Sequence, residues 1–224
     1  MIDDATRWDL VHKKIYDEGA WHSKYAEEKE KLFPKGCTVV DLGGGTGADA
    51  MYFLKSGHKV VVLDISEFAL KVAQEKAKSL NLSDKLVVRQ VDFGLHALPL
   101  KDDSIDVAYS RISLNYFPAD QTTVVFKDVY RFLKAGGKAY LSFKSPDDAA
   151  EMEYLSKSAV LYEPNVFIEN GQLRSRFTIE QLKVMLREAG ISNFQVAPYK
   201  EPLAPKEGGH HPVLTVNEVV FTKS

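Results

Sequence analysis

The sequence predicts an α/β protein built on a doubly wound, mostly parallel sheet with helices on both faces. Short β-branched runs typical of buried strands alternate with stretches of helical periodicity between residues 37 and 144. A glycine-rich turn, GGGTG at residues 43–47, follows the first run. Alternation of this kind implies right-handed crossovers, which place the strands parallel and cover both faces of the sheet with helices.

The predicted strands are short apolar runs. Those of the alternating region are Thr38–Leu42, Lys59–Leu63, Leu86–Val91, Ile105–Tyr109 and Lys138–Phe143. Residues 192–222 predict two more strands, about Asn193–Tyr199 and Val213–Thr222, joined by a loop rich in Pro, Gly and His. We expect these two to pair antiparallel at the edge of the sheet.

The predicted helices have recognisable ends. Ser66 is a candidate N-cap for a helix after the second strand, and another helix runs through Val125–Leu133 before two glycines. Thr178 and Gln181 form a capping box ahead of a third helix. The first 33 residues are also expected to be helical. Residues 145–177 interrupt the alternation, and Asn170-Gly171 predicts a β-hairpin there.

Composition and charge limit the classes of function. The chain has 224 residues, enough for one sizeable α/β domain, and its net charge of −2 gives no basic field that would gather nucleic acid or an anionic membrane. The single cysteine, Cys37, excludes an intrachain disulfide, and no apolar run approaches the roughly 20 residues of a membrane span. Together with a polar N-terminus, these features predict a soluble, cytoplasmic protein.

The residues around the glycine turn indicate a class of ligand. Glycines there allow a tight turn and let a ligand contact the main chain. Gly43, Gly45 and Ala48 also fit the G-x-G-x-x-G/A pattern of dinucleotide-binding proteins. Asp41, two residues before the first glycine, would repel a pyrophosphate at this turn and attract a cation. The acid therefore favours S-adenosylmethionine, which has an amino-acid end and no phosphate, over a nicotinamide dinucleotide.

Two further acids fit an adenosine. Asp64 closes the second strand and would accept hydrogen bonds from both ribose hydroxyls, a role that dehydrogenases and methyltransferases share; as an alternative, Asp64 and Glu67 fit a helix capping box. Asp92 follows the third strand and would accept from an adenine amino group, while the ring of Phe93 would flank the base.

These motifs resemble those of a known family. Asp41-Leu-Gly-Gly-Gly-Thr-Gly47, Asp64, Asp92-Phe93 and SIDVAYSRISLNYF look like the ordered motifs of class I S-adenosylmethionine-dependent methyltransferases, over residues 36–144. Within the family the chain is similar to the small-molecule branch of tellurite-resistance and thiopurine-type enzymes. The resemblance implies a Rossmann-like sheet of seven strands in the order 3-2-1-4-5-7-6, with strand 7 antiparallel. It also implies methyl transfer from S-adenosylmethionine to an O, N or S atom, with S-adenosylhomocysteine as product.

The resemblance also assigns residues by position. Those expected to bind the cofactor are Asp41, Gly43, Gly44, Gly45, Gly47, Asp64, Ile65, Asp92, Phe93, Ser110 and Arg111. Of these, Ser110 and Arg111 would lie beside the methionine moiety, although an ion pair with Asp106 explains the arginine equally well.

The catalytic group is less clearly indicated. Many relatives have histidine where this chain has Asn115, and asparagine orients a substrate but is no general base near neutral pH. If a base takes part, the candidates are Tyr116, His210 and His211. The adjacent histidines are also explained as a solvated loop, and no cysteine or acid cluster accompanies them, so we predict no metal site.

The whole chain, 1–224, is expected to form a single domain. Residues 1–33 would form a helical lid, 36–144 the cofactor-binding core, 145–177 an insertion over the acceptor site, and 178–224 a final helix and β-hairpin. The aromatic residues of the lid would be Trp8, Tyr16, Trp21 and Tyr25.

The expected partner is a small-molecule acceptor, with no nucleic acid and no membrane, and the protein would be a monomer or homodimer. Three alternatives stay open. They are an NAD(P)-dependent oxidoreductase, which Asp41 disfavours; a non-catalytic scaffold that binds an adenosyl ligand; and an RNA or protein methyltransferase, which the near-neutral charge disfavours.

Overall fold

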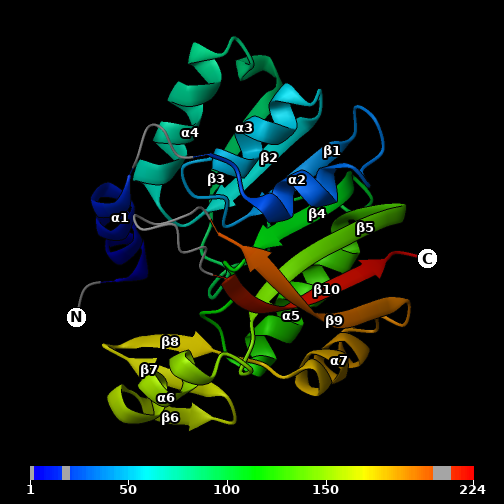
Figure 1. Ribbon diagram of the computed structural model, residues 1–224. Helices are drawn as coiled ribbons and strands as arrows, with labels where there is room; N and C mark the ends of the chain where they lie inside the picture. Colours follow the sequence, from blue (N-terminus) through cyan, green and yellow to red (C-terminus); the bar gives the residue numbers. More distant parts are fainter. Residues whose placement is uncertain (1–2, 17–20, 204–212) are drawn as a thin grey trace.

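The computed structural model describes residues 3–16, 21–203 and 213–224, and its main sheet has seven strands (Figure 1). They are β1 Thr38–Leu42, β2 Lys59–Asp64, β3 Leu86–Gln90, β4 Ile105–Arg111, β5 Leu133–Lys144, β9 Phe194–Pro202 and β10 Val213–Thr222. Their order in space is β3-β2-β1-β4-β5-β10-β9. β10 is antiparallel to both of its neighbours, and the strands from β3 to β5 are parallel. The predicted order, with an antiparallel seventh strand, is therefore confirmed.

β1 lies in the middle of the sheet, where the strand order reverses. Val40 pairs with Val61 of β2 on one side and with Ala108 of β4 on the other. In open α/β sheets a ligand crevice forms at such a reversal, outside the carboxyl ends of the strands. The fold thus brings the ends of β1, β2 and β4 together at one edge.

Helices cover both faces of this sheet. α2 Lys24–Glu30, α3 Ala48–Lys55 and α4 Glu67–Ser79 pack on one face, and α5 Ala119–Phe132 and α7 Ile179–Glu188 pack on the other. Successive side chains of a strand point to opposite faces. Accordingly, Val39 of β1 belongs to the hydrophobic core under α2–α4, and Val40 belongs to the core under α5 and α7.

Side-chain caps fix the ends of the helices. At the start of α4, the amide of Ala69 donates to Ser66 Oγ at 3.1 Å. Thr178 and Gln181 form the predicted capping box of α7. A single 3-10 turn, η1 Ser83–Lys85, leads into β3. α1 Asp4–Ile15 has no buried residue and lies beside α4 (Figure 1).

The insertion forms a small layer of its own, drawn in yellow-green in Figure 1. It contains α6 Ala149–Ser158 and a three-stranded antiparallel sheet of β6 Val160–Glu163, β7 Val166–Glu169 and β8 Gln172–Ser175. The predicted hairpin is present, because Asn170 and Gly171 between β7 and β8 have φ angles of 50° and 74°. Both angles are positive, as a tight type I′ turn requires.

Several strand boundaries differ from the sequence prediction, most clearly the ends of β4 and β9 and the start of β5. β4 continues two residues further, to Arg111, and β5 begins at Leu133 and not at Lys138. The early start of β5 has a partner in the C-terminal segment, since the Gly136 amide donates to the Lys223 carbonyl and the Lys223 amide donates to the Gly137 carbonyl. Across the described ranges, no helix has both the length and the hydrophobicity that crossing a membrane would need.

Candidate active site

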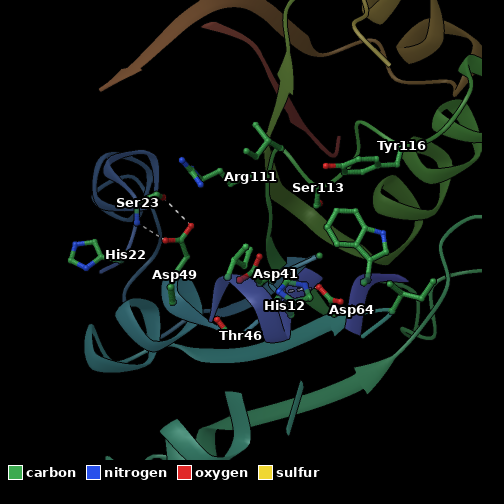
Figure 2. A pocket seen from close by; sticks show the side chains of 18 of the residues that line it. His12, His22, Ser23, Asp41, Thr46, Asp49, Asp64, Arg111, Ser113 and Tyr116 are labelled. Carbon is green, nitrogen blue, oxygen red and sulfur yellow. Dashed lines mark hydrogen bonds between the residues drawn. The ribbon is translucent and has the colours of Figure 1, made fainter. Parts of the chain in front are cut away.

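A cavity of about 1370 Å³ lies at the carboxyl ends of β1, β2 and β4 (Figure 2). Its walls come from the glycine turn after β1, the ends of β2 and β4, the loop after β3, and the end of β9. α1 and the start of α2 cover it, and β8 of the insertion reaches its rim. Pockets for one drug-sized ligand are roughly 300–1,000 Å³. The cavity therefore has room for two small molecules side by side.

The glycine turn and Asp64 form the floor of the cavity. Gly43 and Gly45 have φ angles of 69° and 54°, a left-handed conformation that glycine adopts without a steric penalty. The turn brings the Gly45 amide within 2.8 Å of Asp64 Oδ2, and the Ser66 amide donates to the other oxygen at 2.9 Å. Asp64 is thus held at the end of β2, with lone pairs on both oxygens still free for a ligand.

Asp41 lies beneath the same turn and is 3% exposed. A side chain at Gly44 would place its Cβ 2.5 Å from the Asp41 carboxylate, so glycine is needed there. Burial, together with the charges of Asp49 and Asp64, raises the pKa of the Asp41 carboxyl well above its ordinary 3.8. The carboxylate lines the cavity, and no described residue donates a hydrogen bond to it. A cationic group of a ligand would satisfy this acid.

Asp49 on α3 ties the start of α2 to the cavity wall. One oxygen accepts from the Ser23 amide at 2.6 Å, and the other accepts from Ser23 Oγ at 2.9 Å and from the Tyr109 hydroxyl at 2.7 Å (Figure 2). Ser23 is also the N-cap of α2. Sequence reasoning missed this network because an acid in the first turn of a helix is explained by the helix dipole alone.

Arg111, at the end of β4, is held by Glu201 of β9. Its Nε lies 2.9 Å from each carboxylate oxygen of Glu201, which is 2% exposed on its side chain. Burial opposes the charge, but Glu201 outweighs it and raises the pKa of the guanidinium. The ion pair with Asp106 considered above is wrong, because Asp106 instead accepts from the Thr38 amide and pairs with Lys134. Figure 2 shows the guanidinium directed into the cavity.

One face of α1 closes the cavity from above. Asp4, Trp8, His12 and Ile15 recur at helical spacing and line it. The helix is attached by polar and aromatic contacts: Asp9 Oδ1 accepts from Ser66 Oγ at 2.6 Å and from the Phe68 amide at 3.2 Å, and the Trp8 ring contacts that of Tyr116. Because α1 has no buried residue, it can move without disrupting the core, as a segment that opens and closes over a ligand must.

His12 lies against the floor. A Cβ at Gly45 would be 2.9 Å from its Cε1. Burial lowers the pKa of the imidazole from its ordinary 6.5, although Asp64 and Asp9 act in the opposite direction. The ring is therefore unprotonated at neutral pH. No sequence motif indicated His12, since one histidine on a short helix has no recognisable pattern.

The four aromatic residues expected in the lid have different places. Trp8, Tyr16 and Trp21 line the cavity. Tyr25 does not: it is fully buried in the core beside Tyr109, with ring centroids 5.5 Å apart. Its position one residue inside α2 directs it toward the sheet, so its expected lid role is wrong.

The loop after β3 forms the far end of the cavity. Asp92 and Phe93 of this loop line the cavity, together with Ile65 after β2 and with Phe117, whose ring centroid is 6.3 Å from that of Phe93. One oxygen of Asp92 accepts from the Gly94 amide at 2.8 Å.

Three predicted site residues are not among those that line the cavity. Ser110 Oγ donates to the Leu42 carbonyl at 3.1 Å, which ties β4 to β1. A Cβ at Gly47 would be 3.0 Å from Cβ of Ala73, so this glycine permits close packing of α4. Asn115, 2% exposed, donates to the Ile112 carbonyl at 2.6 Å and accepts from the Lys144 amide at 2.8 Å.

Of the remaining catalytic candidates, only Tyr116 lies within the described residues. Tyr116 lines the cavity, and burial raises the pKa of its phenol against the opposing charges of Arg174 and Arg176. A protonated phenol is not a base at neutral pH. His210 and His211 lie outside the described residues. Within the described ranges, no cluster of three or more His, Cys, Asp and Glu side chains is arranged to hold a metal ion.

Comparisons with known proteins agree with this geometry. A family model described as a methyltransferase domain matches residues 39–137. An arsenite methyltransferase of Halobacterium salinarum is 31% identical over 175 residues, covering 74% of this chain and 40% of the relative. A ubiquinone/menaquinone biosynthesis C-methyltransferase of Escherichia coli is 30% identical over 178 residues, covering 71% of this chain and 68% of the relative.

The fold is shared with solved structures. A crystal structure of an S-adenosylmethionine-dependent methyltransferase from Methanosarcina mazei matches with a TM-score of 0.68 at 20% sequence identity, over 88% of this chain and 96% of the other. The strand order, the glycine turn with its two acids, and these relatives agree. The chain belongs to the class I S-adenosylmethionine-dependent methyltransferases.

Proposed function

We propose that the protein transfers a methyl group from S-adenosylmethionine to a small-molecule acceptor. The observation that carries this proposal is the Asp41 carboxylate, which is buried, faces the cavity and has no donor among the described residues. The ammonium of the methionine end would satisfy it. A pyrophosphate would instead meet three acids, Asp41, Asp49 and Asp64, which disfavours the nicotinamide alternative.

The residues around Asp41 fit the rest of the donor. The terminal nitrogens of Arg111 have no partner among the described residues and would bind the methionine carboxylate. Asp64 would accept from the ribose hydroxyls, and Asp92 and Phe93 would contact the adenine. Because Glu201 and the backbone amides already fix Arg111 and Asp64, these groups need little reorganisation on binding.

When bound, S-adenosylmethionine would supply a methyl group on a positively charged sulfur: a lone pair of the acceptor forms the new bond to the methyl carbon, and the electrons of the broken carbon–sulfur bond stay on sulfur. The protein's part is alignment and exclusion of water. α1 covers the cavity with Trp8 and His12. For an acceptor that loses a proton, His12 is unprotonated at neutral pH and would receive it.

The cavity favours an organic acceptor. Arsenic(III), the substrate in the name of the halobacterial relative, binds soft thiolate ligands. The only cysteine of the chain, Cys37, does not line the cavity; its Sγ lies 3.2 Å from His58 Nδ1 in the core. We propose an O, N or S atom as the nucleophile, and the name of the E. coli relative adds carbon as the alternative.

The test is turnover with labelled donor. The protein is incubated with S-adenosylmethionine and a panel of phenols, amines, thiols and activated ring carbons, and S-adenosylhomocysteine is quantified by mass spectrometry. We expect at least one acceptor to raise its formation above the rate without acceptor. If the protein binds S-adenosylhomocysteine but no acceptor class raises the rate, the non-catalytic scaffold replaces this proposal.

A further inference from the structure

The cavity has a second wall that the donor does not need. Trp8 of α1, Ile112 and Tyr116 after β4, and Gln172 of β8 form it, and we call these four residues the acceptor wall. None of them is charged, in contrast to the acids around the glycine turn. Figure 2 shows Tyr116 across the cavity from Asp41 and Asp49.

Two aromatic rings of the wall form a corner. The ring centroids of Trp8 and Tyr116 are 4.9 Å apart and their planes meet at 79°. The Tyr116 ring is supported from behind, because the Arg174 guanidinium lies 5.2 Å from its centroid and is itself fixed by Glu169 at 3.0 Å. A flat ring would contact both aromatic side chains in this corner, one by its face and the other by its edge.

The backbone of the wall is held in an uncommon conformation. Ile112 has a φ of 50°, a left-handed conformation that β-branched residues rarely adopt. Its amide donates to the Ser142 carbonyl at 3.1 Å, which holds it in place. Such strain persists where the surrounding structure over-determines it, most often at binding and catalytic sites. Here Ile112 and Tyr116 of the same segment both line the cavity.

Gln172 provides the polar group of the wall. It is 8% exposed and lines the cavity, yet its amide has no hydrogen-bond partner among the described residues. Two other glutamines are engaged: Gln121 donates to the Phe93 carbonyl, and Gln181 bonds to Asn165. The amide is open to the cavity, where a hydroxyl or carbonyl group of a ligand can bond to it.

The charges near the wall are already paired. Arg174 binds Glu169, and Arg176 binds Glu151 at 2.8 Å. Neither arginine lines the cavity. Among the described residues, an anionic acceptor would therefore find no unpaired cation at this wall, whereas an uncharged acceptor needs none.

We propose that the methyl acceptor is an uncharged, flat aromatic molecule. Its ring lies in the corner between Trp8 and Tyr116, and its hydroxyl or carbonyl group bonds to the Gln172 amide. This inference rests on the proposed function and adds the chemical class of the acceptor.

The test compares three probes built on the same fused two-ring skeleton. 2-Naphthol is flat, aromatic and uncharged; decahydro-2-naphthol is saturated; and 2-naphthoate is charged. Each is titrated by calorimetry into the full chain saturated with S-adenosylhomocysteine. We expect 2-naphthol to bind about tenfold more tightly than either of the others, because two aromatic contacts favour it. Equal affinity for 2-naphthol and decahydro-2-naphthol, or tightest binding of 2-naphthoate, overturns the proposal.

Variants locate the binding. Trp8→Leu is expected to weaken 2-naphthol about tenfold and cannot disturb the core, since α1 has no buried residue. Gln172→Met is expected to weaken it about fivefold. The matched controls Tyr162→Leu and Gln74→Met, at exposed positions on β6 and α4, should leave it within about twofold. Unchanged binding in both wall variants overturns the proposal.

The outcome separates this inference from the proposed function. If the wild-type protein does not bind S-adenosylhomocysteine, the proposed function fails, and 2-naphthol is titrated into the free protein instead. If S-adenosylhomocysteine binds and 2-naphthol shows no preference over its saturated analogue, only the aromatic class fails.

Discussion

Replacing Asp41 with asparagine is expected to stabilise the ligand-free protein. Burial, with Asp49 and Asp64 nearby, raises the pKa of Asp41 above its ordinary 3.8. The folded protein therefore holds this proton more tightly than the unfolded chain does. The stabilisation is complete below about pH 3.8 and is lost as the pH rises toward the folded pKa, at about 1.4 kcal/mol per pH unit. Asparagine avoids that loss, which should raise Tm by roughly 3–6 °C per unit of pKa shift.

The same substitution should weaken binding of S-adenosylhomocysteine. Removing one partner of a buried charge pair costs about 2–5 kcal/mol. Asparagine retains an acceptor oxygen, so we expect the lower end, about 2 kcal/mol, or roughly 30-fold in Kd. 5′-Methylthioadenosine lacks the amino-acid end, and its affinity for Asp41→Asn should stay within about twofold of wild type.

Calorimetric titration with both ligands, and thermal unfolding between pH 5 and 8, measure these effects. Asp84→Asn, at an exposed position in η1, is the matched control and should change neither property. The reasoning is refuted if Asp41→Asn lowers Tm throughout this range, or if it weakens the two ligands equally, since neither result fits a buried acid that faces an ammonium.

Three further predictions concern residues at or beyond this floor. Glu201→Gln should weaken S-adenosylhomocysteine about tenfold in titrations, because Arg111 loses the partner that fixes it, while 5′-methylthioadenosine is unaffected; equal losses would contradict this. His12→Gln should remove the acid limb that the lowered pKa of His12 places below pH 6.5 in the rate profile with a protic acceptor; a persisting limb would point to another base. Burial raises the pKa of Cys37 from 9.0 to about 11, so iodoacetamide at pH 8 should label it at least about 100-fold more slowly in the native than in the denatured protein; comparable rates would show the thiol to be accessible.

Local patterns predicted much of the fold. Thr38–Leu42 has the same bounds in sequence and structure, and the capping box of Thr178 and Gln181 is present. These features depend on residues only a few positions apart, so the alternation of side chains in a strand, the glycine turns and the helix caps can be recognised in the local sequence. The boundary error at Leu133 has the opposite origin, because Leu133 pairs with Ile105 of β4, and the following Gly136 and Gly137 bond to Lys223, far along the chain.

The sequence predicted those residues of the candidate site that lie at the ends of the predicted strands. Asp41, the glycines and Asp64 follow consecutive strand ends, so sequence alone indicated a shared edge. The pair of Arg111 and Glu201 joins residues 90 positions apart, and only the edge hairpin brings them together. The sequence could not predict which way the Asn115 side chain points. In the structure it bonds to backbone groups and does not line the cavity.

Equilibrium binding tests the central claim most directly. The wild-type protein is titrated with S-adenosylhomocysteine and, in parallel, with NAD⁺. We expect one S-adenosylhomocysteine to bind per chain and NAD⁺ not to bind, because Asp41, Asp49 and Asp64 repel a pyrophosphate. Binding of NAD⁺ without binding of S-adenosylhomocysteine would contradict it.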